Sequence, residues 1–451
     1  MKSLKPALSI LSLFSGAALT FGAPPAESPY SAPQSPFYGQ VRARTEFDDR
    51  AIQDTVTKKG LLYTLLRTRL GFVAVPSPAV EVKVEVQDSR FFGQEPVASA
   101  TNPASATTGD FAREDLEQGY FAIEEGDFKT ALGRQKMTLG SGRFLSTLEW
   151  NNVSRAFDGW SFNYKVAGGA GNLTGMAFLV KDTSMATVQD HDLLSGLYYS
   201  HAITPDIGAD AYAFYEQDRL PETYSGEAAK NFDLEYYGLR SYGKAGMFTW
   251  DGEFIWQGGE VLVGAKDLTS EAFQLSARAG VVLGGGAFKI NAGLDMMSGD
   301  KDSTDNTTNL YRANYYFGHA LYGWMDYLDI NPKYGEMDYR VDADLGFLPN
   351  AMGNPRVTLK PQYHYFTPQN APSGKDDPYG QEFDLEAHVA LYPKSNIVFG
   401  AGLFIPGDGY LQIPNAGVSG ANTINEVGTK LNATSKTENG IYLYFMPTFN
   451  F

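Results

Sequence analysis

From Phe37 onward, the chain alternates apolar and polar residues over short stretches. In the clearest stretch, 80–87, four valines alternate with Glu81, Lys83, Glu85 and Gln87. Because successive side chains of a β-strand point to opposite faces, each stretch predicts a strand with one apolar and one polar face. The same pattern recurs in stretches 39–46, 66–72 and 160–165.

The breaks between these stretches narrow the fold further, because short turn sequences alternate with long polar segments. Short breaks include 75–78, 125–127, 204–206 and 284–286, and long segments include 47–60, 91–114, 136–155, 259–270, 298–333 and 405–437. A half-buried soluble sheet has no reason to keep this rhythm, which is typical of outer-membrane barrels with tight periplasmic turns and long external loops. The sequence therefore predicts an all-β fold, a transmembrane up-and-down antiparallel β-barrel of about 18 strands over residues 37–451.

The two ends of the chain support an outer-membrane location. Lys2 and Lys5 precede an apolar run over 7–19, which predicts a signal peptide over 1–22. A Pro-, Ser- and Ala-rich stretch over 23–36 predicts a disordered periplasmic leader. The chain closes on an aromatic-rich strand ending at Phe451, which resembles the assembly signal of outer-membrane proteins. Pro447 departs from that pattern because proline cannot donate to a strand ladder.

Composition excludes several other classes of protein. The formal net charge is -16, and -16 - 2 = -18 once Lys2 and Lys5 are removed, which argues against nucleic acid as a partner. The chain has no cysteine, so a disulfide-stapled fold and a cysteine metal site are excluded. The histidines form no pair with metal-ligand spacing, and no serine elbow motif is present. We therefore expect no cofactor, no metal and no enzymatic step.

Basic residues in the first strands are the main candidates for a functional site. Arg42, Arg44, Arg67, Arg69 and Lys83 alternate with apolar residues, and an arginine on the lipid face at mid-membrane would cost roughly 2–4 kcal/mol. We therefore expect them to face the lumen, where guanidinium groups would attract carboxylate-bearing solutes. Alternatively, they pair with acidic residues of the same strands and stiffen the wall. Both interpretations can apply at once if basic residues lie on one wall and acidic residues on the other, which would create a transverse electric field across the lumen.

Segment 136–155 is a second candidate. Arg134 lies just before it, Arg143 lies within it and Arg155 is its last residue. It is expected to fold into the pore as a constriction, with an exposed surface loop as the alternative. Asp300, Asp302 and Asp305 are spaced like part of a cation-binding run but lack the glycine and terminal glutamate of an EF-hand, which favours a solvated acidic loop. Aromatic residues near strand ends are expected to form interfacial girdles, with sugar-stacking tracks as the alternative.

Several blocks along the chain resemble the alginate export family of outer-membrane porins. They are 86–90, 132–135, Arg143 with 150–152 and 155–159, 254–258, 298–302, 316–318, 380–385 and 404–407. The resemblance implies a monomeric barrel in outer-membrane lipid with an arginine-lined pore that passes an anionic carbohydrate, such as acidic polysaccharide or uronate-type sugars. The expected pore-lining residues are Arg42, Arg44, Arg67, Arg69, Lys83, Arg90, Arg134, Arg143 and Arg155.

Other functions remain open at this point. A weakly selective general diffusion porin is the nearest alternative. An adhesin would have a blocked lumen, and an outer-membrane hydrolase would need a catalytic set at the rim, for which His201 or His364 are candidates.

Overall fold

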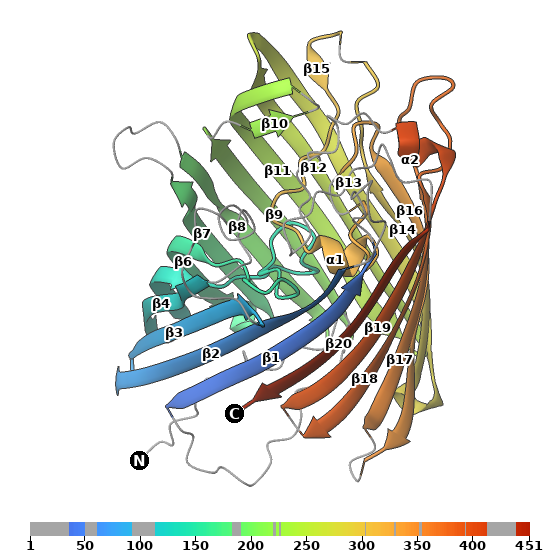
Figure 1. The fold of residues 1–451 in the computed structure, drawn as a ribbon. Helices are drawn as coiled ribbons and strands as arrows, with labels where there is room; N and C mark the ends of the chain where they lie inside the picture. The colour runs from blue at the N-terminus through green and yellow to red at the C-terminus, as the bar shows by residue number, and fades with distance from the viewer. Residues whose placement is uncertain are drawn as a thin grey trace.

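A computed structural model of the chain describes residues 36–49, 61–92, 113–182, 191–219, 222–224, 227–302, 304–328, 331–350, 354–392, 394–412 and 439–451. The predicted signal peptide, and the predicted leader up to residue 35, lie outside the described residues. Within the described ranges, 18 strands close into an antiparallel β-barrel, and the short strands β10 and β15 are added at its upper end (Figure 1). The predicted fold class and strand number are confirmed.

The barrel strands follow one another around the wall in chain order, each pairing antiparallel with the next. The strands are β1 (Phe37–Asp48), β2 (Leu61–Ser77), β3 (Val80–Phe91), β4 (Arg113–Glu125), β5 (Phe128–Gln135), β6 (Phe157–Val166), β7 (Gly171–Asp182), β8 (His191–Thr204), β9 (Ile207–Asp218), β11 (Glu227–Ala245), β12 (Phe248–Val263), β13 (Lys266–Leu283), β14 (Phe288–Met297), β16 (Glu336–Pro349), β17 (Pro355–Thr367), β18 (Gly380–Tyr392), β19 (Ser395–Pro406) and β20 (Gly440–Asn450). The additional elements are η2 (Ala167–Gly169), β10 (Glu222–Tyr224), η3 (Gly284–Gly286), β15 (Thr307–Thr308), α1 (Gly318–Leu321) and α2 (Asp408–Gln412).

Pairing of β1 with β20 closes the barrel. The ladder pairs Gln40 with Asn450 and Asp48 with Tyr442, but it is interrupted opposite Met446 and Pro447. Proline has no backbone N–H to donate, so the interruption falls where the sequence requires it. Pairing in register continues on both sides of the gap, which leaves the closure intact.

The strands alternate between a lumen face and an outer face. On β9, Asp210, Tyr212 and Phe214 are buried inside the barrel, whereas Ala211 and Ala213 are exposed outside. Large apolar side chains dominate the exposed outer face, with Leu239 at 65% and Tyr237 at 50% exposure. A sheet that closes on itself pairs its backbone groups internally and can present such a face to hydrocarbon. None of the described helices is long and apolar enough to cross a membrane.

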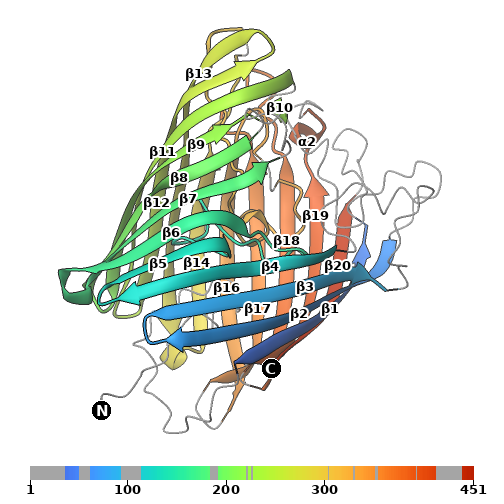
Figure 2. The same ribbon diagram turned by 90° about the vertical axis from the view of Figure 1, so that its left-hand side faces the viewer.

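The connections differ between the two ends of the barrel. Short turns lie at the end of the barrel where β1 begins and β20 ends (Figures 1 and 2), as between β4 and β5 or between β8 and β9. The prediction of a long polar connection over 259–270 is wrong, because strands β12 and β13 extend through most of this range and turn tightly at Gly264 and Ala265. Gly264 has φ +61°, a conformation that suits glycine in a two-residue hairpin.

Candidate functional site

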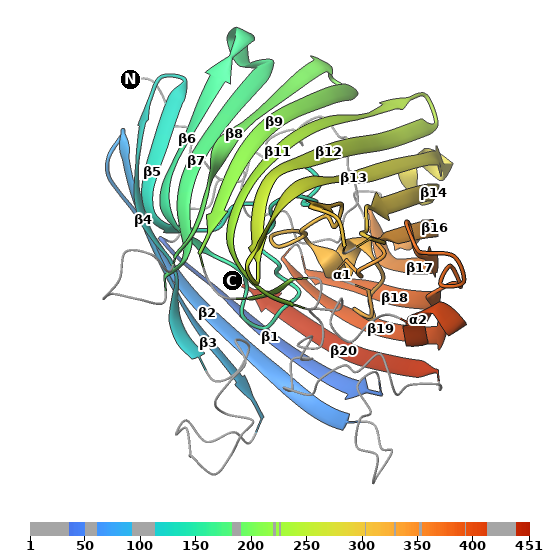
Figure 3. The ribbon, with the colours of Figure 1, turned by 90° about the horizontal axis from the view of Figure 1, so that it is seen from above.

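Two connections fold into the barrel and bridge its lumen. The first is segment 136–156, between β5 and β6, and the second is segment 309–328, which includes α1 and belongs to the connection between β14 and β16. Seen from above, both lie inside the ring of strands (Figure 3). The expectation that 136–155 folds into the pore therefore matches the structure, and the two segments together are the candidate functional site.

Arginines of β1 and β2 hold the first segment by its backbone carbonyls. Arg42 donates to the carbonyls of Glu149 and Asn151 at 2.8 and 2.9 Å, and Arg44 donates to the carbonyl of Trp150. Arg67 donates to the same two carbonyls as Arg42, at 3.1 and 3.0 Å. These arginines face the lumen side of the wall but are almost fully buried by the segment. Their N–H groups therefore position the constriction.

Carboxylates complete this attachment. Arg69 forms ion pairs with Glu149 at 2.7 Å and with Glu117 of β4 at 3.0 Å. Lys136, the first residue of the segment, contacts Glu117 and Glu149 at 2.7 Å each and Glu85 at 3.4 Å. Burial alone would raise the pKa of Glu149, but Arg69, Lys136 and Arg67 outweigh it and hold that pKa well below its ordinary value. Glu149 is therefore charged, and the buried arginines have counter-ions.

The same segment reaches the opposite wall. Arg143 forms an ion pair with Asp295 of β14 at 2.9 Å, and Ser141 donates to Glu253 of β12. The ring of Phe144 stacks on Phe214 of β9 with centroids 4.5 Å apart. Because one short segment is fixed to β1 and β2 at one end and to β9, β12 and β14 at the other, it spans the lumen.

The second segment is attached through a cluster of carboxylates on β8 and β9. Asp192, Glu216 and Asp218 place carboxylate oxygens within 4.8 Å of one another. Arg312 forms ion pairs with Glu216 at 2.9 Å and with Asp218 at 2.5 Å, and the Tyr315 hydroxyl donates to Asp192 and Glu216. A guanidinium and a phenol from the segment therefore occupy this acidic cluster.

Acidic residues of β18 hold the second segment by its backbone N–H groups. The N–H of Met325 donates to Glu382 at 2.9 Å, and that of Trp324 lies 3.4 Å from Asp384. Gly323 has φ +89°, and a Cβ there would lie 2.4 Å from the Glu382 carboxylate, so the approach requires glycine. One wall thus binds carbonyls through arginines, and the other binds N–H groups through carboxylates.

The two inserted segments also bind each other. The N–H of Ser146 donates to Tyr315 at 2.8 Å, and that of Phe317 donates to Gly142 at 3.0 Å. Arg155 donates to the Asn314 carbonyl at 3.0 Å. These backbone contacts make the bridge a single hydrogen-bonded unit.

Not every predicted pore residue lies inside the barrel. Arg90 and Arg134 lie on the outer face of the barrel, on the same face of their strands as Val86 and Leu132, and pair there with Asp88 and Asp158. This corrects their expected pore-lining position. Strand parity already indicates the correction, because Arg90 is four residues from Val86 and Arg134 is two from Leu132. A charge on this face is tolerated near a membrane interface.

Lys83 and its neighbours form the basic surface that stays partly exposed to the lumen. Lys83 is half-buried, with its Nζ 5.3 Å from the centroid of the Tyr38 ring. Among the described residues, no carboxylate oxygen forms an ion pair with it, whereas nearby Lys129 pairs with Glu81 at 3.4 Å. Lys129 of β5 and Lys136 at the start of the inserted segment are close enough to act electrostatically on Lys83, so the three residues form a lysine cluster beside β3 and β5.

Periodicity could not reveal several residues of the site. Five residues belong to the site only because the inserted connections contact the barrel wall in the folded protein: Trp150, His319, Glu117, Glu382 and Asp384. The acidic run in the outer part of the β14–β16 connection instead forms local turns, in which Asp302 donates its N–H to Asp300 and Thr304 donates to Asp302, both at 3.0 Å. Each of these carboxylates accepts backbone N–H groups of its own loop.

Comparisons with known proteins agree with this architecture. The family profile described as Alginate export matches residues 34–332. A BenF-like porin from Pseudomonas fluorescens Pf-5 has a similar structure, with a TM-score of 0.58 and 13% identity, covering 92% of this chain and 97% of that one.

Two porins of Pseudomonas aeruginosa are also similar. OccK2 (OpdF), solved in complex with glucuronate, has a TM-score of 0.57 and 11% identity, covering 92% of this chain and 97% of its own. OpdK, solved with vanillate, has a TM-score of 0.55 and 12% identity, covering 92% of this chain and 98% of its own. These likenesses extend over nearly the whole barrel and establish its fold. No curated protein sequence matches the chain.

Proposed function

Because the chain belongs to the alginate export family and is an outer-membrane β-barrel channel, we propose that it passes small anionic organic solutes, with carboxylates of the uronate type as the first candidates. It acts as a monomer in outer-membrane lipid, by passive flow and without an enzymatic step. Selectivity comes from charge and width at the inserted segments.

The observation that carries this proposal is the lysine cluster beside the constriction. Lys83 faces the lumen without an ion-pair partner among the described residues, so its charge is available to a passing solute. Another part of the wall is acidic, with Glu382, Asp384 and Glu386 buried along β18, which is separated from β3 by four strands. Such an arrangement produces a transverse field that directs a carboxylate toward β3 and β5.

The inserted segments favour small solutes over a polymer. Both segments are fixed to opposite walls, and they are hydrogen-bonded to each other. A polysaccharide chain would have to displace this bridge, whereas a single sugar acid would need only a much narrower opening. The carboxylates named for the similar porins, glucuronate and vanillate, are of this smaller class.

A weakly selective general porin is the second candidate, and one specific observation favours it. Arg42, Arg44, Arg67 and Arg69 are almost fully buried and already bonded to segment 136–156 or to carboxylates. The charges of Arg44, Arg67 and Arg69 are thus largely neutralised by carboxylates before a solute arrives. The two candidates differ in how much the remaining lysines bias the current.

Reversal potential in a KCl gradient, measured on the refolded barrel in a planar bilayer, distinguishes the candidates. We expect a preference for anions that falls roughly two- to sixfold in Lys83→Gln, the effect of a unit charge about 8 Å from the ion at an effective dielectric constant of about 40–80. Arg134→Gln, which removes a charge from the outer face, is the matched control and should leave selectivity unchanged.

Each remaining outcome has a definite meaning. Equal permeability to both ions would favour the weakly selective porin. Preference for cations would contradict the anionic-solute proposal but would still show that the protein is a channel. Absence of conductance through a folded barrel would redirect attention to the adhesin and hydrolase alternatives.

A further inference from the structure

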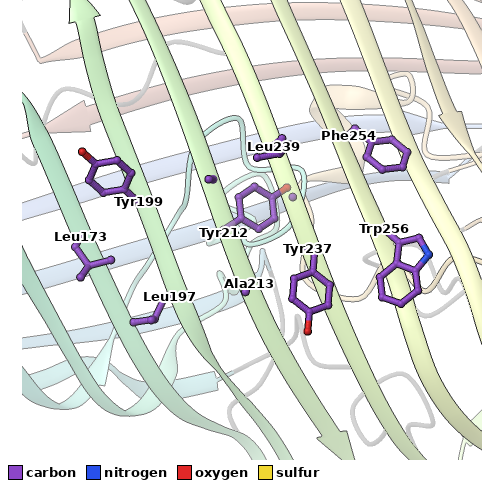
Figure 4. A pocket seen from close by; sticks show the side chains of 11 residues that line it. Leu173, Leu197, Tyr199, Tyr212, Ala213, Tyr237, Leu239, Phe254 and Trp256 are labelled. Carbon is purple, nitrogen blue, oxygen red and sulfur yellow. The ribbon is translucent and has the colours of Figure 1, made fainter.

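We propose that the outer face of the barrel carries a seat for one acyl chain of a phospholipid, centred on β9. A hollow of about 590 Å³ lies there, between ridges formed by β8 on one side and β11 and β12 on the other (Figure 4). This volume falls within the roughly 300–1,000 Å³ typical of small-molecule pockets. The proposal concerns the lipid-facing surface and is independent of what the lumen transports.

Alternation of side-chain size creates the hollow. Ala211 and Ala213 point outward from β9, where neighbouring strands carry large residues at the paired positions. Ala211 pairs with Tyr199 on one side and Leu239 on the other, and Ala213 pairs with Leu197 and Tyr237. Phe254 and Trp256 of β12 extend the far ridge. Two methyl groups therefore form a floor between aromatic and aliphatic walls.

The inner face of the same strands fixes this floor. Tyr212, between the two alanines, points into the barrel and donates to Glu253 at 2.7 Å. Its ring covers Gly238 of β11, where an added Cβ would lie 2.0 Å from the ring. Because the lumen side is packed this closely, the floor of the hollow cannot collapse or fill from within.

The surroundings of the hollow indicate a hydrocarbon occupant. The hollow is continuous with the exposed apolar band of the outer face, where Leu197, Tyr237 and Leu239 are 49%, 50% and 65% exposed. The two tyrosine hydroxyls at its edges bond within the protein, Tyr199 with His201 at 2.9 Å and Tyr237 with Glu235 at 3.1 Å. The hollow therefore offers shape and van der Waals contact, which drive association in a bilayer.

The position of the hollow along β9 gives its depth in the membrane. Ala211 and Ala213 are four and six residues beyond Ile207, where β9 begins at the short-turn end. With a rise of about 3.4 Å per residue and a tilt of about 40°, they lie roughly 10–16 Å from that end. Short turns mark the periplasmic side, and an apolar band of about 25 Å has its midplane near this depth, so the hollow lies where an acyl chain can reach it.

Native mass spectrometry of the detergent-purified full barrel, incubated with palmitoyl-oleoyl phosphatidylethanolamine, tests the proposal. We expect one retained lipid on the unaltered protein and a loss of about tenfold or more in that signal for the double variant A211L/A213L, which fills the floor. The matched control is A279L/A292L, which adds the same bulk to paired outward alanines of β13 and β14. Single-channel conductance checks that both variants fold.

A second measurement does not depend on the leucine variants. In a protein whose other four tryptophans are changed to phenylalanine, Trp256 reports on the hollow, and a phospholipid with a brominated acyl chain should quench its fluorescence saturably at about one lipid per barrel. Two results would overturn the proposal. One is equal lipid retention in all three proteins, and the other is a cross-link between two barrels that A211L/A213L removes, which would make a second copy the occupant.

Discussion

The indole of Trp150 and the imidazole of His319 lie parallel, with ring centroids 3.8 Å apart and an interplanar angle of 9°. Trp150 belongs to the segment held by the arginine wall, and His319 to the segment held by the carboxylates. The Arg44 guanidinium carbon lies 4.1 Å from the centroid of the same indole. One ring therefore couples the barrel wall to both inserted segments.

Removing the Trp150 ring should loosen the junction between the segments. An aromatic pair contributes about 0.5–1.5 kcal/mol beyond burial, so Trp150→Ala should raise the ratio of open to closed dwell times roughly two- to tenfold. Single-channel recordings measure this ratio. Trp160→Ala removes an indole from the outer face and should change nothing, and an equal effect of both substitutions would contradict a role for the stack.

The arginine attachment predicts a change of pore size. Arg69→Gln removes one of the basic partners of Glu117 and Glu149, the others being Lys136 and, for Glu149, Arg67, and breaking a buried ion pair costs about 3–5 kcal/mol. We expect segment 136–156 to detach and single-channel conductance to rise, while heat-modifiable gel mobility shows an intact barrel. Arg90→Gln on the outer face is the matched control. Unchanged conductance in Arg69→Gln would mean that the segment stays in place without this anchor.

Close approach at Gly323 predicts a clash that a second change relieves. Gly323→Ala would place a Cβ 2.4 Å from the Glu382 carboxylate and should unseat Met325, producing a noisier current. Shortening the carboxylate with Glu382→Asp should restore part of the quiet behaviour. Gly374 has a similar positive φ, +80°, but a Cβ added there would have no atom within 4 Å. Gly374→Ala therefore imposes the backbone strain without the clash and serves as the control.

The charge of Glu149 predicts a pH response with a definite sign. Because its folded-state pKa is depressed, the stability it contributes is present above the unfolded pKa and is lost as pH falls through the folded pKa. The difference in conductance between the unaltered protein and Glu149→Gln should therefore persist from neutral pH to below the ordinary glutamate value of about 4.3. A difference that disappears above that value would show that Glu149 is not held by its basic neighbours.

Sequence periodicity predicted the wall better than the contents of the lumen. Parity places Arg42, Arg44, Arg67 and Arg69 on the inner face, as the structure has them, because the cost of charge in hydrocarbon acts on each strand separately. Applied to Arg90 and Arg134, the same parity gives their outward position. What these arginines bind could not be predicted, since backbone carbonyls near Trp150 carry no residue-specific signal.

The connections were the harder part for a related reason. Their length and polarity indicate a loop but do not distinguish an external loop from one that folds inward. Segment 136–156 folds inward because its Glu149 matches Arg67 and Arg69, which lie about 80 residues earlier in the chain. Complementarity of that kind is visible only when both partners have been placed in space.

One inserted segment is held by arginines and the other by carboxylates, and this limits how such a pore can be widened. Deleting segment 136–156 would remove Glu149 and the backbone carbonyls that bind the arginines of β1 and β2. Arg44 would keep Glu46 and Arg69 would keep Glu117, but Arg42 and Arg67, which lie side by side as cross-strand partners, would be left without these acceptors. Their mutual repulsion would fall with added salt, as unpaired charges are screened. A wider channel of this design therefore requires two simultaneous changes, a shorter loop and a less basic wall. Shortening the loop alone should yield a barrel whose stability depends on ionic strength.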